Sequence, residues 1–350
     1  MSNPDRPLPG AVIFGCSGPT LTGEEREFFR SANPLGLILF DYNCETPEQI
    51  AALTASFREA VGRDDAPVLI DQEGGRVARL KAPHWRHPPP SAVFAEAAKK
   101  DLDLACRAAR LNARLMARDL RAVGVTVDCA PVIDVPVPGA DDIIGDRALG
   151  ADVETIAALG RAVCDGLLDE GVLPIVKHMP GHGRARADSH KDLPTVDEPL
   201  ELLDKSDFAT FRLLNDMPWA MTAHIVFPAV DKDRPATISP TVINEIIRGS
   251  IGFDGVVVSD DIGMEALSGT LAERATAVIG AGCDAVLECW GKLDLMREIA
   301  AVVPALSEDA AERVARAEAM RLRRQKEAPA ASDDMLSELT RLLPEAGQAG

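Results

Sequence analysis

The chain is poor in positive charge, has no apolar run long enough to cross a bilayer, and has no Cys-x-x-Cys pair. Its 350 residues include 37 basic and 55 acidic side chains, and the formal net charge at pH 7 is −18. A surface with this excess of negative charge repels nucleic acid and anionic membranes. A membrane-spanning helix needs about 20 consecutive, mostly apolar residues. We therefore expect neither nucleic acid nor a membrane as a partner.

The cysteines also lack the pattern of a disulfide framework or a zinc site. Their number is odd, several lie in apolar runs, and no Cys/His cluster occurs. This usage is typical of reduced, mostly buried thiols in a cytoplasmic protein. The apolar segment 11–16 ends in Gly-Cys, as a lipoprotein signal does, but it is short and follows a Pro-rich stretch, which favours a buried strand. The seven cysteines are Cys16, Cys44, Cys106, Cys129, Cys164, Cys283 and Cys289.

Short, continuously apolar runs recur along the chain and alternate with helical patterns. Runs without polar alternation are typical of parallel strands that are buried on both faces. Eight strand–helix alternations predict an α/β fold, specifically a single-domain (β/α)8 barrel of the TIM type. A doubly wound sheet is the alternative, because the sequence does not reveal which distant strands pair. The eight runs are 11–14, 35–40, 68–70, 123–127, 172–176, 219–223, 256–258 and 285–287.

Helix start and stop signals separate these runs. Thr46 and Pro47 supply an N-cap and an N1 proline for a helix over 50–61. We expect one catalytic barrel over residues 1–330 and a C-terminal tail over 331–350 that is partly helical and mobile at its end. Further helices are predicted over 102–123, 152–168, 242–248 and 309–326.

Ionisable and polar residues follow five of the apolar runs at their C-terminal ends. In a (β/α)8 barrel the catalytic groups lie at these ends of the strands and in the loops that follow them. An apolar core does not need ionisable groups repeatedly at one end, so the set predicts a polar, ligand-binding mouth. These segments are Asp71–Arg76, Asp128–Pro131, Lys177–His178, Ala223–His224 and Ser259–Asp261.

Residues 178–196 have no helical or alternating apolar pattern and contain three of the six histidines, His178, His182 and His190. Structureless loops of this length inside compact domains are usually functional. A metal held by the histidines and Asp188 is one interpretation, but the spacing fits no familiar zinc or iron site. Another is that the histidines, His182 above all, only cap backbone groups. The Asp188 carboxylate can fix the tautomer of His190 and raise its pKa, which suits proton donation near neutral pH.

The segment Lys177–Gly183, followed by Asp188, Ser189 and His190, resembles the signature of the glycoside hydrolase family 3 β-N-acetylglucosaminidases, which act in bacterial cell-wall recycling. Because its length leaves no room for the second, α/β-sandwich domain that many members carry, we expect it to belong to the compact single-domain subgroup. Three further segments agree with the family in their order along the chain, namely 71–80, 144–150 and 255–264.

This resemblance implies roles for eight residues. Asp260 would be the nucleophile that attacks the anomeric carbon with retention of configuration, and His190, oriented by Asp188, would be the general acid/base. The alternative is that Asp260 only caps the following helix and that Asp261 matters more. The remaining five would bind the sugar hydroxyls and the acetamido group, and they are Asp71, Arg79, Arg147, Lys177 and His178.

Three departures from the family pattern lie beside these residues. Met179 stands where the family usually has an aromatic residue, and Ile262-Gly263 replaces a commoner Leu-Ser type pair. The basic stretch 184–186 replaces a less basic loop, and we expect it to alter what the loop meets on the aglycone side.

Three other residues are open to more than one interpretation. Arg76 is expected to be structural, beside a tight turn at Gly74-Gly75. Trp85 is expected to pack at the surface rather than to stack on a sugar. His224 fits a pocket role and a structural role equally well.

The predicted function is that of a retaining exo-β-N-acetylglucosaminidase. The implied substrates are peptidoglycan turnover fragments, GlcNAc linked to anhydro-N-acetylmuramic acid with or without peptide. No cofactor and no metal is implied, and we expect a monomer or a weak homodimer. An imidazole that has donated its proton is neutral and repels an incoming anion less than a carboxylate would, so a GlcNAc or glucose phosphorylase is a second hypothesis. A non-catalytic sugar-binding barrel is a third, against which the intact Asp260, Asp188 and His190 argue.

Overall fold

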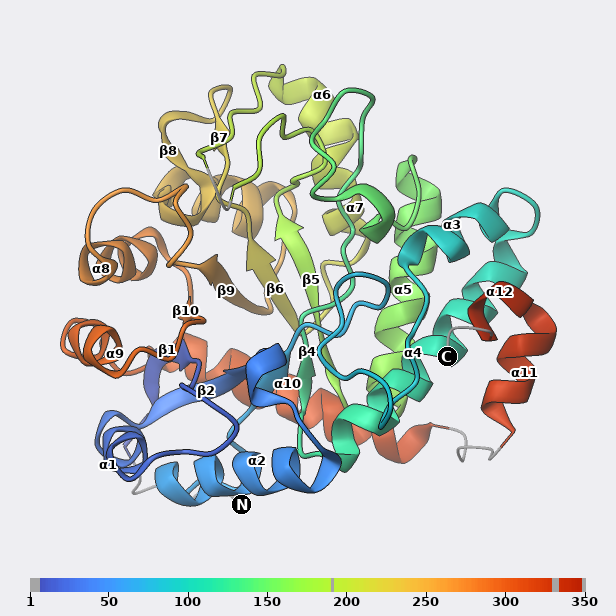
Figure 1. Cartoon of the computed structure of the whole chain (residues 1–350). Coiled ribbons are helices and arrows are strands. Elements are labelled where there is room, and N and C mark those ends of the chain that lie inside the picture. The colour runs from blue at the N-terminus through green and yellow to red at the C-terminus, as the bar shows by residue number, and fades with distance from the viewer. Residues whose placement is uncertain (1–6, 190–191, 329–333, 348–350) are drawn as a thin grey trace.

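The structure is a computed structural model that describes residues 7–189, 192–328 and 334–347. Within these residues, eight parallel strands close into a barrel in the order β1-β10-β9-β6-β5-β4-β3-β2 (Figure 1). The closed sheet confirms the predicted (β/α)8 barrel, and the doubly wound alternative is wrong. The barrel strands are β1 (Gly10–Phe14), β2 (Pro34–Leu39), β3 (Val68–Ile70), β4 (Val127–Asp128), β5 (Leu173–Met179), β6 (Trp219–Thr222), β9 (Val256–Asp261) and β10 (Ala285–Glu288).

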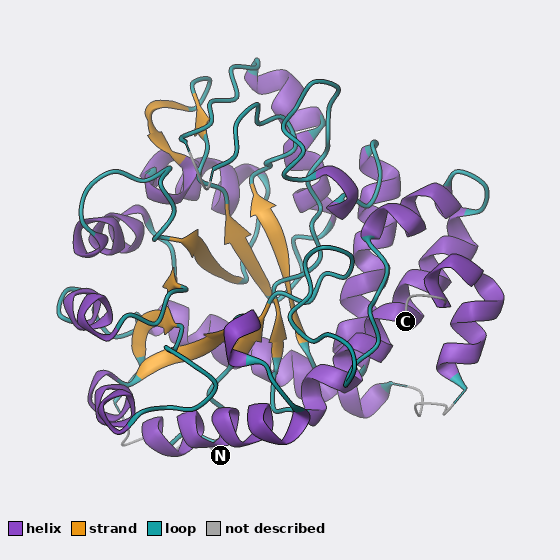
Figure 2. Ribbon diagram, viewed as in Figure 1, coloured by secondary structure: helices purple, strands orange, loops and turns teal. Residues whose placement is uncertain are grey.

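Helices surround these strands, and Figure 2 shows them outside the sheet with loops between the two. The α-helices are α1 (Gly23–Ala32), α2 (Pro47–Val61), α3 (Ser91–Ala98), α4 (Leu102–Ala122), α5 (Val153–Asp169), α6 (Leu200–Lys205), α7 (Asp207–Leu213), α8 (Leu271–Ala281), α9 (Leu293–Ala300), α10 (Glu308–Glu327), α11 (Met335–Leu342) and α12 (Pro344–Gly347). A π-helix spans Val242–Ser250, and 3-10 turns span Asp41–Asn43, Gly145–Arg147 and Ala236–Ile238. No helix among the described residues is both long and apolar enough to cross a membrane.

Both faces of the barrel strands are apolar, which explains the continuous runs in the sequence. In β1, Ala11 and Ile13 belong to the cluster inside the barrel. Val12 and Phe14 belong to the cluster between the strands and the surrounding helices. Successive side chains of a strand point to opposite faces, so a barrel that is covered outside and filled inside needs apolar residues at every position.

Helix α10 closes the N-terminal end of the barrel. The amide of Leu306 donates to the carbonyl of Pro9 at 2.8 Å, just ahead of β1. Ala310 and Ala317 on α10 join the cluster inside the barrel. With this end filled by apolar side chains, the opposite end of the strands is left for a binding site.

Local signals set several element boundaries. Thr46 caps α2 as predicted, because its side chain accepts a hydrogen bond from the amide of Gln49. The predicted strand 123–127 is wrong over most of its length, since β4 spans only Val127–Asp128. Gly124 has a φ of 83° and turns the chain directly after α4. Its carbonyl accepts from the guanidinium of Arg58 at 2.8 Å, which fixes this turn against α2.

Other elements are longer than predicted or were not predicted. Strand β5 continues to Met179 and β9 to Asp261, so Lys177, His178 and Asp260 lie within strands. A small antiparallel pair, β7 (Val226–Phe227) with β8 (Asp231–Pro235), follows β6 and was not predicted from the sequence. The predicted helix 242–248 is present, in π-helical form.

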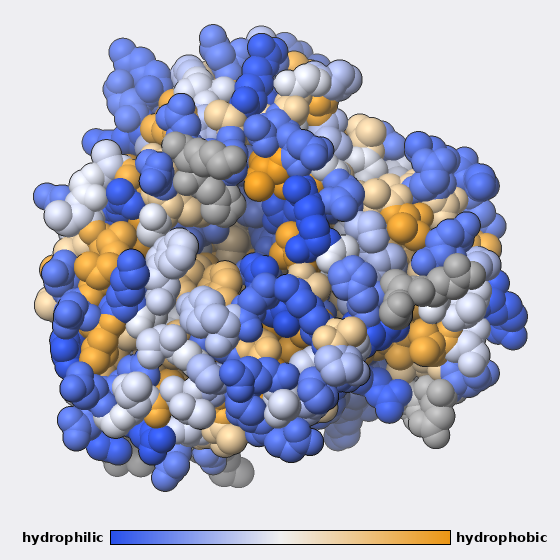
Figure 3. Space-filling model, in the orientation of Figure 1, coloured by the Kyte–Doolittle hydropathy of each residue, from blue (hydrophilic) through white to orange (hydrophobic). Residues whose placement is uncertain are grey.

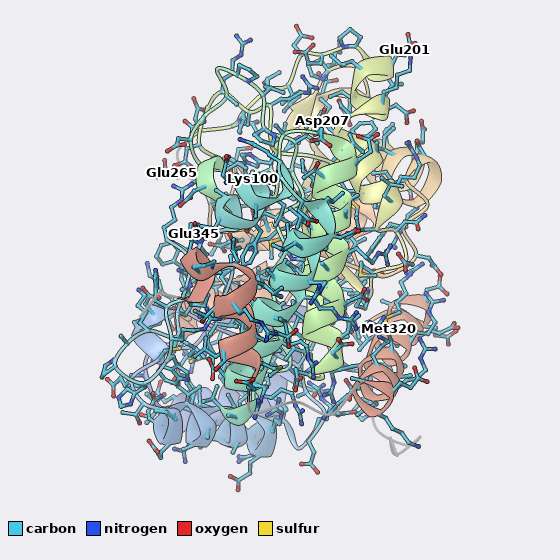
Figure 4. The ribbon with its side chains drawn as sticks, turned by 90° about the vertical axis from the view of Figure 1, so that its right-hand side faces the viewer. Lys100, Glu201, Asp207, Glu265, Met320 and Glu345 are labelled. Atoms are coloured by element: carbon cyan, nitrogen blue, oxygen red, sulfur yellow. The ribbon has the colours of Figure 1, made fainter. Side chains whose placement is uncertain are left out.

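The C-terminal segment packs beside α4. Figure 4, which views the right-hand side of Figure 1, shows α11 against α4, and α4 alongside α5. Met335 and Leu339 on α11 are buried. Residues 331–333 and 348–350 of the predicted tail lie outside the described residues.

Candidate active site

A cavity of about 310 Å³ lies at the C-terminal end of the barrel strands. Figure 3 shows a recess near the centre of the face that Figure 1 presents, bordered by both hydrophilic and hydrophobic residues. The structure brings six of the eight predicted site residues into this cavity. They are Asp71, Arg79, Arg147, Lys177, His178 and Asp260.

Lys177 stands at the centre of a buried charged group. Its ammonium nitrogen lies 2.8 Å from Asp71 Oδ1 and 2.7 Å from Glu73 Oε1. Burial by itself lowers the pKa of Lys177, but these two carboxylates outweigh it and raise that pKa. Burial likewise opposes ionisation of Asp71, and the charges of Lys177 and Arg79 bring its pKa below the usual value. All of these groups are therefore charged near neutral pH.

Two arginines complete this charged group. Arg147 donates from Nε and Nη2 to the two carboxylate oxygens of Glu73, both at 2.8 Å. Arg79 Nη2 donates to Asp71 Oδ2 at 3.1 Å, and its guanidinium lies over the ring of Phe40 at 5.2 Å. Paired in this way, the side chains are held in place while keeping donors and acceptors toward the cavity. Glu73 belongs to the segment 71–80 that resembles the family, but its role as the link between Lys177 and Arg147 was not predicted.

The segment after β3 is fixed by its own side chains and by a tight turn. Gln72 Oε1 accepts from the amides of Arg79 and Leu80 at 2.8 and 3.0 Å. Gly74 has a φ of 96°, and a Cβ there would lie 2.4 Å from the carbonyl oxygen of Pro89, so only glycine fits. Asp128 was predicted at the mouth, but it is fully buried beneath this segment and accepts from the amide of Gln72 at 3.0 Å.

Arg76 has the structural role that was expected. Its Nη2 donates to the carbonyls of Asp142 and Ile143 at 2.7 and 2.8 Å. Its Nε lies 2.9 Å from Asp146. Arg76 thus fixes the loop that carries Arg147 over the end of β3.

Asp134, to which no motif in the sequence pointed, positions two histidines. His178 Nδ1 lies 2.8 Å from Asp134 Oδ2, and the backbone amide of His182 donates to Asp134 Oδ1 at 2.7 Å. Burial opposes ionisation of Asp134, but the imidazole of His178 lowers its pKa, so it accepts as a carboxylate. His178 Nδ1 is therefore the donor in this contact, which leaves Nε2 for a ligand in the cavity.

His182 does not simply cap backbone groups, as one interpretation held. Its ring lines the cavity, and Nε2 lies 3.1 Å from the hydroxyl of Ser189. Burial, and then the neighbouring His178, lower the pKa of His182 to about 4, so its ring is neutral near pH 7. Ser189 is buried and also lines the cavity. His190 lies outside the described residues, and Asp188 is partly buried beside Ser189.

The metal interpretation of this loop involves His190, which lies outside the described residues. Within them, no group of three or more His, Cys, Asp or Glu side chains is arranged to hold a metal ion.

Asp260 stands near the end of β9 and faces the cavity. Burial raises the pKa of its carboxyl, but the imidazoles of His224 and His178 and the amide of Asp261 outweigh burial, and the pKa is lowered. His224 is fully buried, with Nδ1 2.8 Å from the hydroxyl of Thr237 and Nε2 2.9 Å from the carbonyl of Asp261. Because the carbonyl can only accept, Nε2 is the donor. His224 therefore supports the end of β9 and does not line the cavity.

Asp261 also lines the cavity, but its carboxylate is occupied by hydrogen bonds from the backbone. Its Oδ1 accepts from the amides of Gly263 and Cys289 at 2.9 and 3.3 Å. Burial raises the pKa of Asp261 to about 6. Of the two neighbouring aspartates, Asp260 is therefore the better carboxylate for chemistry in the cavity.

Two remaining expectations concern residues that lie away from the cavity lining. Trp85 packs against the core and against the ring of His84, as expected for a surface-packed aromatic residue. In the basic stretch 184–186, the Nε of Arg184 lies 2.6 Å from the buried carboxylate of Asp207 at the start of α7. This pair anchors the loop after β5 to the helical layer.

The cavity rim also carries aromatic residues that were not predicted. Phe40 and Tyr42 follow β2, and Trp290 follows β10. The polar mouth was predicted from the ionisable residues that follow each strand. The aromatic residues at the same positions would have identified all three.

Comparison with known proteins decides the family. Residues 19–321 match the model of the glycosyl hydrolase family 3 N-terminal domain. The chain belongs to glycosyl hydrolase family 3. It is an enzyme of the β-hexosaminidase type, which confirms the resemblance drawn from the four motifs.

Individual relatives agree with this assignment. The chain is 39% identical over 286 residues to a β-hexosaminidase of Alkalilimnicola ehrlichii, with 81% of each chain covered. It is 38% identical over 297 residues to the β-hexosaminidase of Bordetella parapertussis, with 83% and 82% covered. NagZ from Neisseria gonorrhoeae, solved in complex with N-trifluoroacetyl-D-glucosamine, superposes with a TM-score of 0.85 at 30% identity, over 98% of this chain and 99% of that one.

Proposed function

We propose that this protein is a retaining exo-β-N-acetylglucosaminidase that releases terminal, non-reducing GlcNAc from peptidoglycan turnover fragments. The position and charge of Asp260 carry the proposal, because its carboxyl faces the cavity with a lowered pKa. A retaining glycosidase needs an ionised carboxylate beside the anomeric carbon. The N-acylated amino sugar bound to the gonococcal relative supports GlcNAc as the sugar.

The remaining charged residues suit a single bound sugar. Asp71, Arg79, Arg147, Lys177 and His178 offer both donors and acceptors, and each buried hydroxyl of a sugar must find a partner. A volume of about 310 Å³ lies at the small end of the range for ligand pockets, which fits one terminal sugar ring rather than an extended chain. This supports exo action.

The mechanism has two steps. Asp260 attacks the anomeric carbon while His190 protonates the glycosidic oxygen, which leaves with the aglycone, and a glycosyl-aspartate forms. A water molecule, deprotonated by His190, then attacks the anomeric carbon, and the Asp260 carboxylate is released. Asp188 fixes the tautomer of His190 throughout. Ser189, which stands between these two residues in the chain, is held at the cavity by His182, and this supports the assignment.

The natural aglycone and the location follow from the family resemblance. We expect anhydro-N-acetylmuramic acid, with or without peptide, on the leaving side, and a monomer or weak homodimer in the cytoplasm. All seven cysteines are free, which supports a reducing compartment.

Hydrolysis of p-nitrophenyl N-acetyl-β-glucosaminide in buffers with and without phosphate tests the proposal. Free GlcNAc in both buffers, with the β configuration retained in the first-formed product, is the expected result. GlcNAc-1-phosphate in the phosphate buffer would replace the hydrolase with a phosphorylase on the same residues. Absence of turnover in both buffers would instead favour a sugar-binding barrel.

A further inference from the structure

Trp290 stands at the rim of the cavity, directly after β10. Its side chain lines the cavity, yet 57% of the residue is exposed. The side chains of Lys177 and Arg147, assigned above to the sugar, are only 2% and 10% exposed. Tryptophan combines a large apolar face with a single polar N–H, which suits a site that is dry on one side and wet on the other. Trp290 therefore lies between the buried part of the cavity and solvent.

Two carboxyl groups hold Trp290, one through its backbone and one through its indole. The backbone amide of Trp290 donates to Glu288 Oε1 at 2.9 Å. The indole N–H hydrogen-bonds to the side chain of Asp261, the neighbour of the proposed nucleophile Asp260. A ring that is already fixed loses little conformational freedom when a ligand binds.

Gly263 makes this position of the indole possible. A Cβ at residue 263 would lie 2.4 Å from Trp290 Nε1 and 2.7 Å from Trp290 Cδ1. The family usually has a Leu-Ser type pair where this chain has Ile262-Gly263, so the departure coincides with the space that the indole fills. We take Gly263 and Trp290 as one paired feature of this chain.

A second aromatic residue adjoins this place. The hydroxyl of Tyr42 donates to the carbonyl of Cys289 at 3.0 Å, so the loops after β2 and β10 meet across the end of β1. Tyr42 stacks on Phe40 with ring centroids 6.2 Å apart and 9° between the planes. Tyr42 lines the cavity and is 44% exposed. The outer part of the cavity is thus lined by aromatic side chains, whereas its buried part is lined by charged side chains.

We propose that Trp290 is a specificity-determining residue, which stacks on the ring of a sugar on the aglycone side of the cleaved bond. The inference rests on the proposed function, because it takes the anomeric carbon to lie at Asp260. With the terminal sugar among the buried charged groups, the leaving group must lie toward solvent, where the exposed aromatic rings stand. The apolar C–H face of a pyranose ring matches the indole face, whereas a leaving group without a ring has nothing to stack.

The experiment compares two substrates that share the same terminal sugar. We would measure kcat/KM for N,N′-diacetylchitobiose, which has a pyranose leaving group, and for methyl N-acetyl-β-glucosaminide, which has none. In Trp290→Ala the ratio of the two values should fall about tenfold, mainly through a higher KM for the disaccharide. Trp290→Phe, which keeps an aromatic face, should retain most of the ratio. Gly263→Ala, which displaces the indole, should lower it as Trp290→Ala does.

Leu322→Ala is the matched control, because Leu322 is an exposed apolar residue on α10 that does not line the cavity, and its ratio should equal that of the wild type. If the wild type hydrolyses both substrates and Trp290→Ala keeps the ratio, the inference is wrong and the proposed function stands. An equal loss on both substrates would also overturn it, because Trp290 would then act through Asp261 on the site as a whole. If the wild type hydrolyses neither substrate, the proposed function itself fails, and the inference fails with it.

Discussion

The ammonium nitrogen of Lys177 lies 2.7 Å from a carboxylate oxygen of Glu73, and the two side chains are only 2% and 4% exposed. A buried pair of this kind offsets the cost of taking two charges out of water only while both partners are present. Lys177 also neutralises Asp71, so it compensates two buried carboxylates at once. The organisation of the site and the stability of the fold are therefore linked at this residue.

Replacement of Lys177 by methionine should destabilise the fold. Because Asp71 and Glu73 lose a shared counter-charge, we expect the free energy of unfolding to fall by about 3–5 kcal/mol. Urea unfolding followed by circular dichroism measures this. Lys205→Met is the control, because Lys205 pairs with Glu201 on the surface at 71% and 82% exposure, and its loss should cost less than about 1 kcal/mol. Similar losses in the two variants would contradict the buried network.

Replacement of Asp260 by alanine should abolish turnover and leave the fold intact. Without the carboxylate no covalent intermediate forms, so kcat should fall roughly a thousandfold or more. Steady-state hydrolysis of p-nitrophenyl N-acetyl-β-glucosaminide, together with the thermal melting temperature, tests both parts. Turnover at the wild-type rate would remove Asp260 from the mechanism.

Replacement of His190 by alanine should depend on the leaving group. An alkyl leaving group needs protonation, and its hydrolysis should slow by roughly 10² to 10⁴-fold. A p-nitrophenolate leaving group barely needs a proton, so the bond-cleavage step should slow far less. Methyl and p-nitrophenyl glycosides compared in single-turnover experiments separate the two cases. An equal loss on both would show that His190 is not the acid.

Glu288 should make stability depend on pH. Burial raises the pKa of its carboxyl from the ordinary value of 4.5 to about 7. Between these two pKa values, the folded state binds the proton more tightly than the unfolded chain does. The resulting stabilisation of the fold is complete below the pKa of the unfolded chain, and it is lost as the pH rises through the pKa of the folded state. In Glu288→Gln this loss is absent.

The wild type should therefore lose on the order of 3 kcal/mol more than Glu288→Gln when the pH is raised across the window. Urea unfolding of both proteins at about pH 4.5 and pH 8 measures the difference. Parallel pH profiles for the two proteins would mean that Glu288 does not hold its proton in the folded state.

Chelation should leave activity unchanged, because every chemical step above is assigned to a side chain. The measurement is the rate of p-nitrophenyl glycoside hydrolysis after dialysis against EDTA, with and without added zinc. Loss of activity that zinc restores would replace the glycosyl-aspartate mechanism with a metal-dependent one.

Part of this protein follows from the amino-acid sequence alone. Continuous apolar runs predicted parallel strands and a barrel, because strands buried on both faces have no polar positions. The polar residues after these runs predicted where the site lies, since the carboxyl ends of parallel strands meet at one end of a barrel. Family motifs then named Asp260, His190 and their neighbours.

Other features were decided only by the tertiary structure. Nothing local shows that Glu73 joins Lys177 to Arg147, or that Asp134 holds His178, because these partners are separated by many residues and meet only after the barrel closes. Strand β4 was predicted too long because Val123 and Val125 have strand propensity, while the turn at Gly124 and the packing of α4 place them outside the sheet. The indole of Trp290 reaches Asp261 because β9 and β10 are neighbours in the closed barrel, a pairing that local sequence patterns do not determine.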